Sequence, residues 1–225
     1  MSKVNNTRSG CRDVFHSFLV ENANYDGEFE IPVIEADYST PKKLIRFSQA
    51  VSGSEYDAWV HFYEDDALFE RIWNYPRKYL PILKRYEGVI TPDFSLYRDM
   101  PLVMQAWNTY RGKAIGAWLQ HEGVHVICNV RPGDSRTYGF CCNGVPHFCT
   151  IAVGSHGCLK VKADREVFIK GLNHIVHTIH PSIIIVYGAA PDDVFGKYRD
   201  AGIEILQFDS DFAKSRESDI KEEHD

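Results

Sequence analysis

A carboxyl, a hydroxyl and a phenol group follow an apolar run within VITPDFSLYRDMP, residues 89–101. Asp93 comes directly after Pro92, which restricts the turn that ends the run, and Ser95 and Tyr97 follow at alternate positions. An aspartate in such a place can act as a general acid or base or bind a cation, although aspartate also commonly forms a simple Asx turn. We interpret Asp93 and Tyr97 as catalytic candidates and Ser95 as a substrate-binding candidate.

The amphipathic stretch after this run supplies possible anchors for an anionic substrate. Asn108 and Arg111 are three residues apart, so on a helix they share one face. Arg111 can offer a two-pronged donor to a phosphate or a carboxylate. A solvated helix face explains the same spacing equally well. We predict that Asn108 and Arg111 bind substrate near Asp93.

A long loop rich in glycine and proline, RPGDSRTYGFCCNGVPHF, covers residues 131–148. Loops of this length in compact domains are commonly lids or binding segments. Arg131 and Arg136 are placed to hold an anion over the site, and Asp134 is a second carboxyl candidate for catalysis. We predict a substrate-binding role for Arg131 and a catalytic role for Asp134.

Cysteine and histidine crowd into the second half of the chain, where five of the six cysteines fall between Cys128 and Cys158. A metal site is one interpretation, but the chain contains no CxxC, and the spacing of Cys142, His147 and Cys149 differs from that of zinc fingers. The histidines at 174, 177 and 180 favour an exposed stripe on a helix over a metal site. The sequence therefore leaves metal and cofactor open.

The sequence gives little support for other nucleophile or cofactor-binding motifs. Ser155, His156 and Cys158 are too close along one strand end to face each other as a catalytic pair, so a tight turn is the favoured interpretation. The chain has no GxGxxG, no P-loop and no GxSxG. Dinucleotide-binding, Walker-type and α/β-hydrolase sites are therefore not indicated.

Short apolar runs alternate with longer amphipathic runs, which predicts βα units and a predominantly parallel sheet. The predicted strands are 44–47, 58–63, 88–93, 124–130, 150–153, 183–187 and 203–208. The predicted helices are 67–86, interrupted at Pro76 and Pro81, 101–120, and 164–180 with Asp164 as its N-cap. Six to seven such units fit either a small or incomplete β/α barrel or an open doubly wound sheet. Both bind ligands at the carboxyl ends of the strands.

Composition sets the outer limits of the interpretation. The 225 residues are 44% hydrophobic and 25% charged, as in a typical globular protein. We predict a flexible N-terminal segment at 1–24, a single α/β domain at 25–214 and a charged, disordered tail at 215–225. The net charge of −6 excludes a global basic field, although a local groove for nucleic acid is still compatible with it. Because it has no signal peptide and no long apolar run, the sequence predicts a cytoplasmic protein with no membrane partner. The sequence does not determine the oligomeric state.

Several of these segments together resemble a domain-of-unknown-function family found in bacteria, phages and mobile elements. The resemblance covers residues 38–212, and PDFSLY followed by NTYR is its most specific part. It implies a shared fold and a phage or mobile-element setting, and it brings no known activity. The positions that match the family pattern are Asp66, Asp93, Ser95, Tyr97, Asn108, Arg111, Gln120, Asp134 and Gly188. Gln120 joins the substrate-binding candidates on this ground.

The residues and the resemblance together lead to two functional hypotheses. In the first, the protein is an enzyme of a phage or mobile element that acts on a phosphate-bearing nucleotide or nucleic-acid substrate, with hydrolysis as the reaction. In the second, it is a non-catalytic replication accessory or counter-defence factor that sequesters a nucleotide or a host protein. Turnover separates the two, and the sequence leaves the choice between enzyme and binder open.

Overall fold

The computed structural model describes residues 13–210 of the chain. The tail predicted at 215–225 and the first twelve residues of the predicted N-terminal segment lie outside the described residues. The described range contains one large sheet with its helices, and a short antiparallel pair formed by β1 (Tyr25–Asp26) and β2 (Ile31–Pro32).

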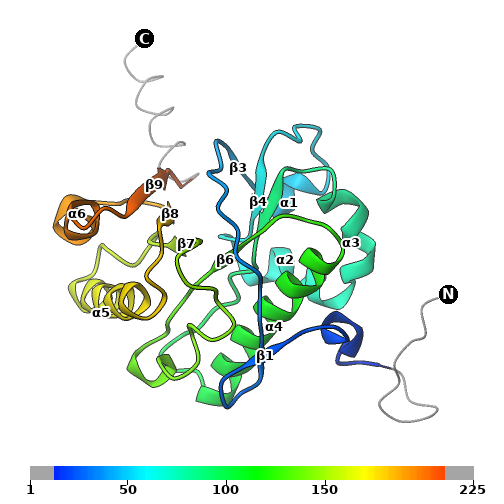
Figure 1. The fold of residues 1–225 in the computed structure, drawn as a ribbon, viewed down its shortest axis with the longest axis horizontal. Coiled ribbons are helices and arrows are strands. Elements are labelled where there is room, and N and C mark those ends of the chain that lie inside the picture. The colour runs from blue at the N-terminus through cyan, green and yellow to red at the C-terminus, as the bar shows by residue number, and fades with distance from the viewer. Residues whose placement is uncertain (1–12, 211–225) are drawn as a thin grey trace.

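The large sheet consists of seven parallel strands that lie side by side in chain order (Figure 1). They are β3 (Leu44–Arg46), β4 (Trp59–His61), β5 (Gly88–Ile90), β6 (Val126–Asn129), β7 (Thr150–Gly154), β8 (Ile183–Tyr187) and β9 (Glu204–Phe208). The predicted α/β fold is confirmed, and each predicted strand is present. A doubly wound sheet reverses its strand order at a switch point, whereas this order never reverses. The chain therefore forms a curled half-barrel.

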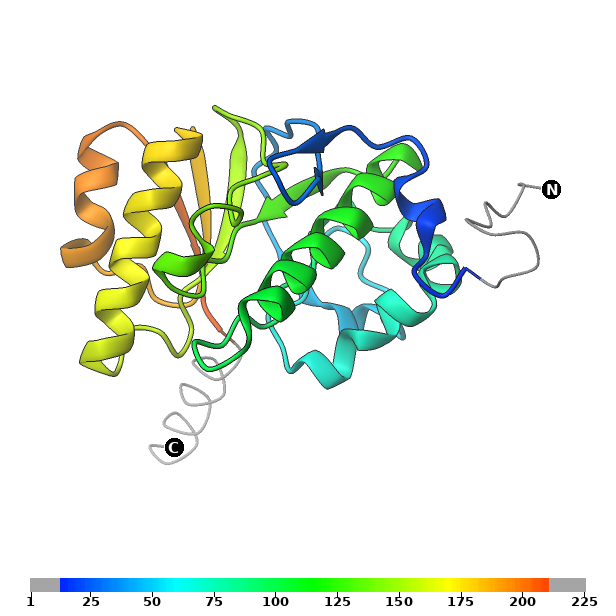
Figure 2. The same cartoon turned by 90° about the horizontal axis from the view of Figure 1, so that it is seen from below.

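Within residues 13–210, six α-helices follow the strands and lie outside the curl of the sheet (Figures 1 and 2). They are α1 (Phe47–Ala50), α2 (Asp66–Asn74), α3 (Pro76–Leu83), α4 (Leu102–His121), α5 (Lys162–Ile179) and α6 (Asp192–Asp200). Right-handed crossovers between neighbouring parallel strands place successive helices on the same side. No helix within residues 13–210 is long and apolar enough to span a bilayer.

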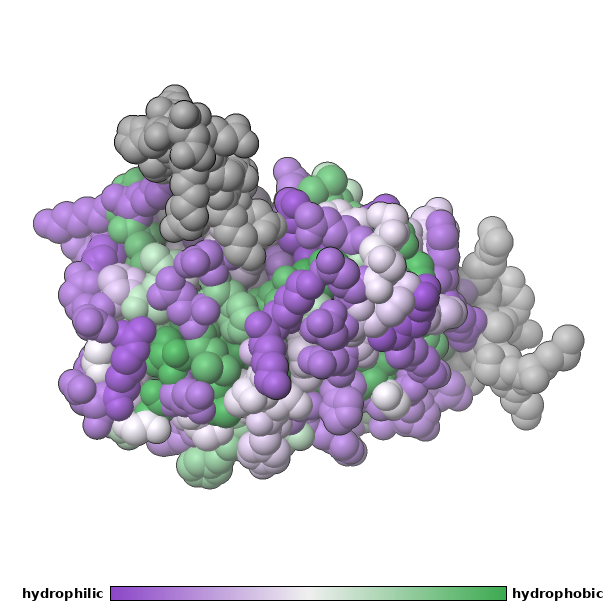
Figure 3. Space-filling model, turned by 90° about the horizontal axis from the view of Figure 1, so that it is seen from above, coloured by the Kyte–Doolittle hydropathy of each residue, from purple (hydrophilic) through white to green (hydrophobic). Residues whose placement is uncertain are grey.

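The half-barrel has two edges, β3 and β9, and the side between them is open. The inner face carries a small cluster of buried side chains, Trp59, Ile90, Ile127, Ala152 and Ile185, while the larger core lies between the sheet and the helices. Leu206 and Phe208 on β9 are only partly buried against the inner cluster. Figure 3 views the molecule from above, where apolar surface is exposed between polar side chains.

Glycine at position 88 allows the inner cluster to pack. A Cβ atom at Gly88 would lie 2.5 Å from the ring of Trp59, which is closer than packed atoms approach each other. The indole of Trp59 therefore lies over β5 in the space that a side chain at position 88 would occupy. Trp59 is 3% exposed, so this arrangement fills the centre of the inner face.

Proline divides the helical stretch between β4 and β5, as predicted. Helix α2 ends at Asn74 and α3 begins at Pro76, a position where the missing backbone N–H of proline has no cost. Pro81, predicted as a second break, lies inside α3. Asp65 caps α2, because its carboxylate accepts a hydrogen bond from the N–H of Ala67 at 3.0 Å.

The predicted N-cap of the α5 helix was wrong. The helix begins at Lys162, and the preceding Val161 makes no side-chain cap. Asp164 lies in the first turn and forms an ion pair with Arg98 from the loop after β5. The VKAD stretch has no strong cap residue at the true start of the helix, so the local pattern points to the carboxylate of Asp164, two residues further on.

The structured region starts before the predicted boundary at residue 25. The 3-10 helix η1 (Ser17–Val20) lies against α4, and Leu19 is 3% exposed within the main core. A single turn is too short to show helical periodicity, so only its packing against α4 reveals this element.

Candidate functional site

Asp93 lies in a chain of hydrogen bonds beyond the carboxyl ends of β4, β5 and β6. One carboxylate oxygen accepts a hydrogen bond from Nδ2 of Asn129 at 2.7 Å, and the other accepts one from the guanidinium of Arg131. The hydroxyl of Tyr63 donates to Oδ1 of Asn129 at 2.9 Å. Neighbouring parallel strands thus bring together residues that lie far apart in the sequence.

Burial changes the acid–base properties of this cluster. Asp93 is 8% exposed, and its loss of hydration raises its pKa, while the charge of Arg131 and the hydrogen bond from Asn129 partly oppose that rise. Burial also raises the pKa of Tyr63 well above its usual value, and the nearby Asp93 charge adds to the rise. Tyr63 therefore acts as a neutral donor, and Asp93 as a carboxyl that holds its proton to a higher pH than usual.

Two adjoining cavities meet at Asp93. Their volumes are about 400 and 440 Å³, within the range of small-molecule sites. The first extends along α5, past apolar side chains that include Phe168 and Leu172. The second extends past Tyr63 and Tyr187. Both are lined by Asp93, Tyr97, Arg131, Gly154, His156 and Cys158, a set that we call the cavity rim.

Aromatic rings and a tight turn shape the second cavity. The rings of Tyr63 and Tyr187 stack with their centroids 4.9 Å apart and their planes 11° from parallel. Gly188, one of the family positions, has a φ of +116°, and a Cβ atom there would lie 2.6 Å from Oγ of Ser155. Glycine thus lets the chain after β8 approach the turn that carries His156.

Asn108 and Arg111 lie behind the loop that carries Asp93. Nδ2 of Asn108 donates to the carbonyl of Ser95 at 2.7 Å, and Arg111 donates to Oδ1 of Asn108 at 2.7 Å and to Glu70. The guanidinium also lies 3.9 Å from the centroid of the Phe94 ring, a favourable cation–π contact. Neither Asn108 nor Arg111 lines the two cavities, and the hydrogen bonds that they make run to other groups of the protein.

Ser95 and Tyr97 both line the second cavity, but the bonds of Ser95 run mainly to the group behind it. The carboxylate of Asp66 accepts hydrogen bonds from the backbone N–H and the hydroxyl of Ser95, at 3.1 and 2.8 Å. Tyr97 is 59% exposed, and its hydroxyl lies 3.2 Å from the Ser95 hydroxyl. Tyr97 belongs to the cavity rim. We call the internally bonded group behind it, Asp66, Glu70, Ser95, Asn108 and Arg111, the buried brace.

Two of the predicted site residues lie apart from the cavities. Asp134 caps the 3-10 helix η2 (Ser135–Thr137) and pairs with Arg136, which holds the pKa of Asp134 below its usual value. Gln120 lies at the far end of α4, where its side chain bonds the backbone of Glu35 at 2.8 and 2.9 Å. The helical rise separates Gln120 from Asn108 by about 18 Å along the axis. The structure therefore does not bring Asp134 and Gln120 to the cavities.

Four residues of the site lay outside the motif that the sequence singled out. Tyr63 and Asn129 bond within the Asp93 cluster, and His156 and Cys158 line both cavities. The stretch VICNVR contains a signal that could have identified Asn129 as a site residue. Asn129 and Arg131 stand at alternate positions at the end of an apolar run and so share one face. His156 and Cys158 follow β7 in a tight turn, and only the curl of the sheet places them near Asp93.

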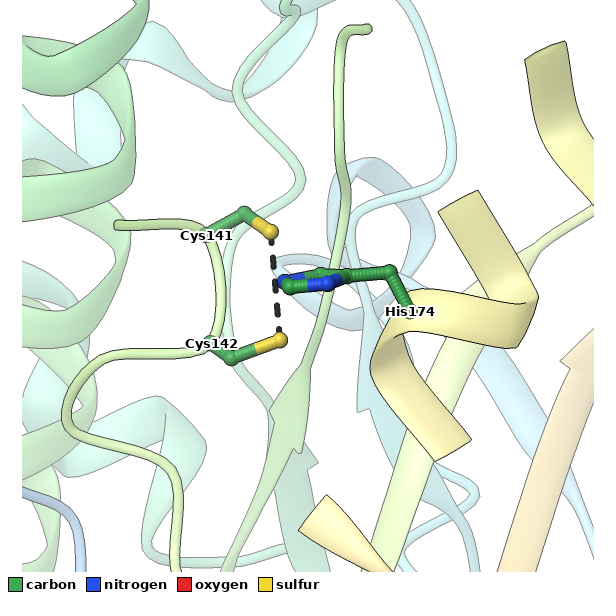
Figure 4. A group of neighbouring side chains, drawn as sticks. All are labelled: Cys141, Cys142 and His174. Atoms are coloured by element: carbon green, nitrogen blue, oxygen red, sulfur yellow. Dashed lines mark hydrogen bonds between the residues drawn. The ribbon is translucent and has the colours of Figure 1, made fainter. Parts of the chain in front are cut away.

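A separate cluster joins the long loop to α5. Sγ of Cys141 and Sγ of Cys142 lie 3.8 Å apart, and the imidazole edge of His174 points at them (Figure 4). The hydrogen bond between the two thiols raises the pKa of Cys141 and lowers that of Cys142, and the charge of Lys113 favours both thiolates. The five described cysteines are free thiols.

The family described as a domain of unknown function (DUF4417) matches residues 23–209. The chain belongs to this family. It is 33% identical over 167 residues to the Gene 1 protein of Mycobacterium phage D29, and 37% identical over 129 residues to that of Mycobacterium phage L5. These matches cover 71% and 57% of this chain but 60% and 56% of the relatives, so the chain spans less than two thirds of their length. No solved structure matches.

The predicted resemblance to a family with phage members is thereby confirmed. The DUF4417 match begins at residue 23, fifteen residues before the predicted start at 38, and ends at residue 209, one residue after β9. All strands of the half-barrel, the cavity rim and the buried brace lie inside it. The names of these relatives state no activity.

Proposed function

We propose that this DUF4417 protein is an enzyme that acts on a phosphate-bearing nucleotide or nucleic-acid end at the cavity rim. The observation that carries the proposal is the position of Asp93, a buried carboxyl with a raised pKa at the boundary of two ligand-sized cavities. Raised carboxyl pKa values of this kind suit general acid–base chemistry near neutral pH. Asp93 is accordingly the proposed acid or base.

Arg131 supplies the proposed recognition of the phosphate. One of its amino groups donates to Asp93, and its side chain, 35% exposed, lines both cavities. A guanidinium has five N–H donors, so the remaining ones are free to hold phosphate oxygens in a fork. The charge of Arg131 thus serves both to hold Asp93 in place and to bind an anion beside it.

The cavity walls suit the uncharged part of a nucleotide. The stacked rings of Tyr63 and Tyr187 border one cavity, and Phe168 and Leu172 of α5 border the other. Tyr187 is 5% exposed and packs against both Tyr63 and His61, so these rings form a firm wall against which the uncharged part of a nucleotide would lie. The hydroxyl of Tyr97 stands at the entrance as a further hydrogen-bond partner.

Hydrolysis is the reaction that we assign to this arrangement. A water molecule gives a proton to the Asp93 carboxylate as its oxygen attacks phosphorus, one P–O bond forms and the bond to the leaving oxygen breaks. Arg131 offsets the negative charge that develops on the phosphate oxygens. The proton on Asp93 then passes to the leaving oxygen, which restores the carboxylate.

A second candidate function, sequestration without turnover, is favoured by one feature of the same cluster. Both oxygens of Asp93 already accept hydrogen bonds, one from Asn129 and one from Arg131. A carboxylate with both oxygens engaged in this way can serve as a rigid positioning group as well as a proton carrier. In this form the protein holds a nucleotide, or a host protein that presents an anionic group, at the same rim.

Nucleoside mono-, di- and triphosphates and short oligonucleotides with terminal phosphates are the probes that test the proposal. Binding is followed by thermal shift, and turnover by phosphate release and chromatography of products. Asp93→Asn is expected to abolish turnover, and Arg131→Gln to weaken binding about tenfold or more. Asp134→Asn and Arg136→Gln are the matched controls, because this pair lies apart from the cavities.

The outcomes distinguish the two functions. Turnover by the natural protein that is lost in Asp93→Asn supports the enzyme. Binding that depends on Arg131, with no product from any probe, supports sequestration. If Asp93→Asn and Arg131→Gln both behave like their controls in binding and turnover, the site assignment is wrong.

A further inference from the structure

The cluster of Cys141, Cys142 and His174 lies apart from the cavity rim and has the composition of a metal site. One candidate ligand atom from each residue lies within 4.8 Å of the other two. The two cysteines end a turn of the loop that starts at Arg131, and the histidine comes from α5. Cys141 and Cys142 are 1% and 7% exposed, and His174 is partly buried.

The distance between the sulfur atoms matches a shared tetrahedral ion. Zinc–sulfur bonds of about 2.3 Å at tetrahedral angles separate two sulfur ligands by about 3.8 Å. Sγ of Cys141 and Sγ of Cys142 are 3.8 Å apart. The two sulfurs therefore need no rearrangement to bind one zinc ion.

The imidazole of His174 is held in place by the same loop. Its ring stacks on Tyr138 with the centroids 4.3 Å apart and the planes 7° from parallel. Nε2 of His174 also lies 3.1 Å from the carbonyl oxygen of Tyr138. Contacts of this type commonly orient histidine ligands at metal sites. Figure 4 shows the ring directed at the two sulfurs.

We propose that Cys141, Cys142 and His174 bind one Zn²⁺ ion, with a water molecule in the fourth position. Thiolates and imidazole are the ligands that zinc prefers, and three protein ligands form an incomplete tetrahedron. Within residues 13–210 no other group of three such side chains has this spacing. The ion joins the loop after β6 to α5, two elements that both line the first cavity.

The spacing of the ligands in the sequence explains why sequence patterns do not indicate this site. Zinc motifs are recognised by ligand pairs two to four residues apart, whereas adjacent cysteines do not form such a pair. The third ligand, His174, stood in a row with His177 and His180, which suggested an exposed stripe. Only the packing of the loop on α5 shows that His174, rather than His177 or His180, lies beside the two cysteines.

Cobalt(II) provides a direct test, because thiolate ligands give Co²⁺ strong charge-transfer absorption and a tetrahedral site gives characteristic visible bands. The full chain is stripped of metal under a non-chelating phosphine reductant and titrated with Co²⁺ and then with Zn²⁺. We expect one equivalent of Co²⁺ to develop both bands and one equivalent of Zn²⁺ to remove them. A wild-type protein that develops no thiolate charge-transfer band would overturn the proposal.

Variants identify the ligands. Cys142→Ser and His174→Asn are each expected to weaken Zn²⁺ binding by about 100-fold or more. The matched controls are Cys149→Ser, a buried thiol outside the cluster, and His177→Asn, an exposed histidine on the same helix. Ligand variants that bind Zn²⁺ as tightly as the controls would show that the ion binds elsewhere.

A second measurement requires no substitution and so does not depend on whether a variant folds. Zn²⁺ is expected to slow the alkylation of Cys141 and Cys142 at least tenfold, as followed by peptide mass spectrometry, and to leave Cys158 unchanged. Zn²⁺ should also raise the melting temperature, since it binds the folded state. Equal alkylation rates with and without Zn²⁺ would contradict the site.

Discussion

The cavity rim and the buried brace each contain an aspartate and an arginine but use them differently. In the brace, Asn108, Arg111 and Ser95 direct their polar groups at one another and at Asp66 and Glu70. At the rim, the polar side chains border open cavities that a ligand could fill. Residue type alone therefore does not distinguish a group that contacts ligand from one that supports it.

The connection between the two regions is the segment from Asp93 to Tyr97. Asp93 and Tyr97 lie at the rim, while the side chain and backbone of Ser95 are held by the brace. The brace thus fixes the backbone on which the rim side chains stand. Substitutions in the brace should act mainly on stability, and substitutions at the rim mainly on ligand binding.

Arg111→Met should have the largest effect on stability. The change removes hydrogen bonds to Asn108 and Glu70 and the contact with the Phe94 ring. The Glu70 side chain is 39% exposed, so most of the expected loss of about 3 kcal/mol comes from the unpaired oxygen of Asn108 and the lost ring contact rather than from the ion pair. Urea denaturation should show this loss in the free energy of unfolding, against less than about 0.5 kcal/mol for the exposed Arg136→Met. Equal losses in the two variants would mean that the brace is no more important than the surface.

Asn108→Ala should follow, with a loss of about 2 kcal/mol. The side chain is 7% exposed and links the Ser95 carbonyl to the guanidinium of Arg111. Its removal leaves a buried acceptor and a buried donor without their partner. A double-mutant cycle with Arg111→Met measures the coupling, and additive losses would show that the two residues do not act together.

Asp93→Asn should cost about 1 kcal/mol near neutral pH, because asparagine has one acceptor oxygen and cannot replace both the bond from Asn129 and the bond from Arg131. The pH dependence is more specific. Burial raises the pKa of Asp93 above 3.8, so its stabilising contribution is complete below that value and is lost as pH rises through the raised pKa. The free energy of unfolding of the natural protein, minus that of Asp93→Asn, should therefore fall as pH rises across this window. A difference that increases with pH would show that Arg131 outweighs burial.

Tyr97→Phe should have the smallest effect on stability, within about 0.5 kcal/mol. The side chain is 59% exposed and its hydroxyl bonds only at the edge of the brace. Ligand affinity measured by titration with the same nucleotide probes is expected to fall severalfold. A large loss of stability here would remove the distinction between rim and brace.

Sequence patterns predicted the helices and strands well where neighbouring residues determine them. The runs WVH, VICN and IIIVY form buried strands because the removal of their apolar side chains from water is favourable. The break between α2 and α3 followed from Pro76. The start of α5 was misplaced and η1 was missed, since a short turn and an uncapped helix start leave almost no local signal.

The candidate site was predicted only in part. Asp93, Tyr97 and Arg131 were singled out and lie together at the cavity rim. Asp134 and Gln120 had suitable chemistry but lie elsewhere, because the positions of the loop turn and of the helix end are set by packing. Tyr63 and Asn129 needed the lateral pairing of β4, β5 and β6 to reach Asp93.

By itself, the sequence determined a parallel α/β chain with seven strands and polar residues at their carboxyl ends, since both features follow from local hydrophobic patterning. The tertiary structure decided three things that periodicity does not encode. Sequential strand order made the sheet a half-barrel, its curl brought His156 and Cys158 to Asp93, and the loop after β6 met α5 at His174. Each depends on contacts between distant segments, whose relative positions are fixed only when the whole core packs.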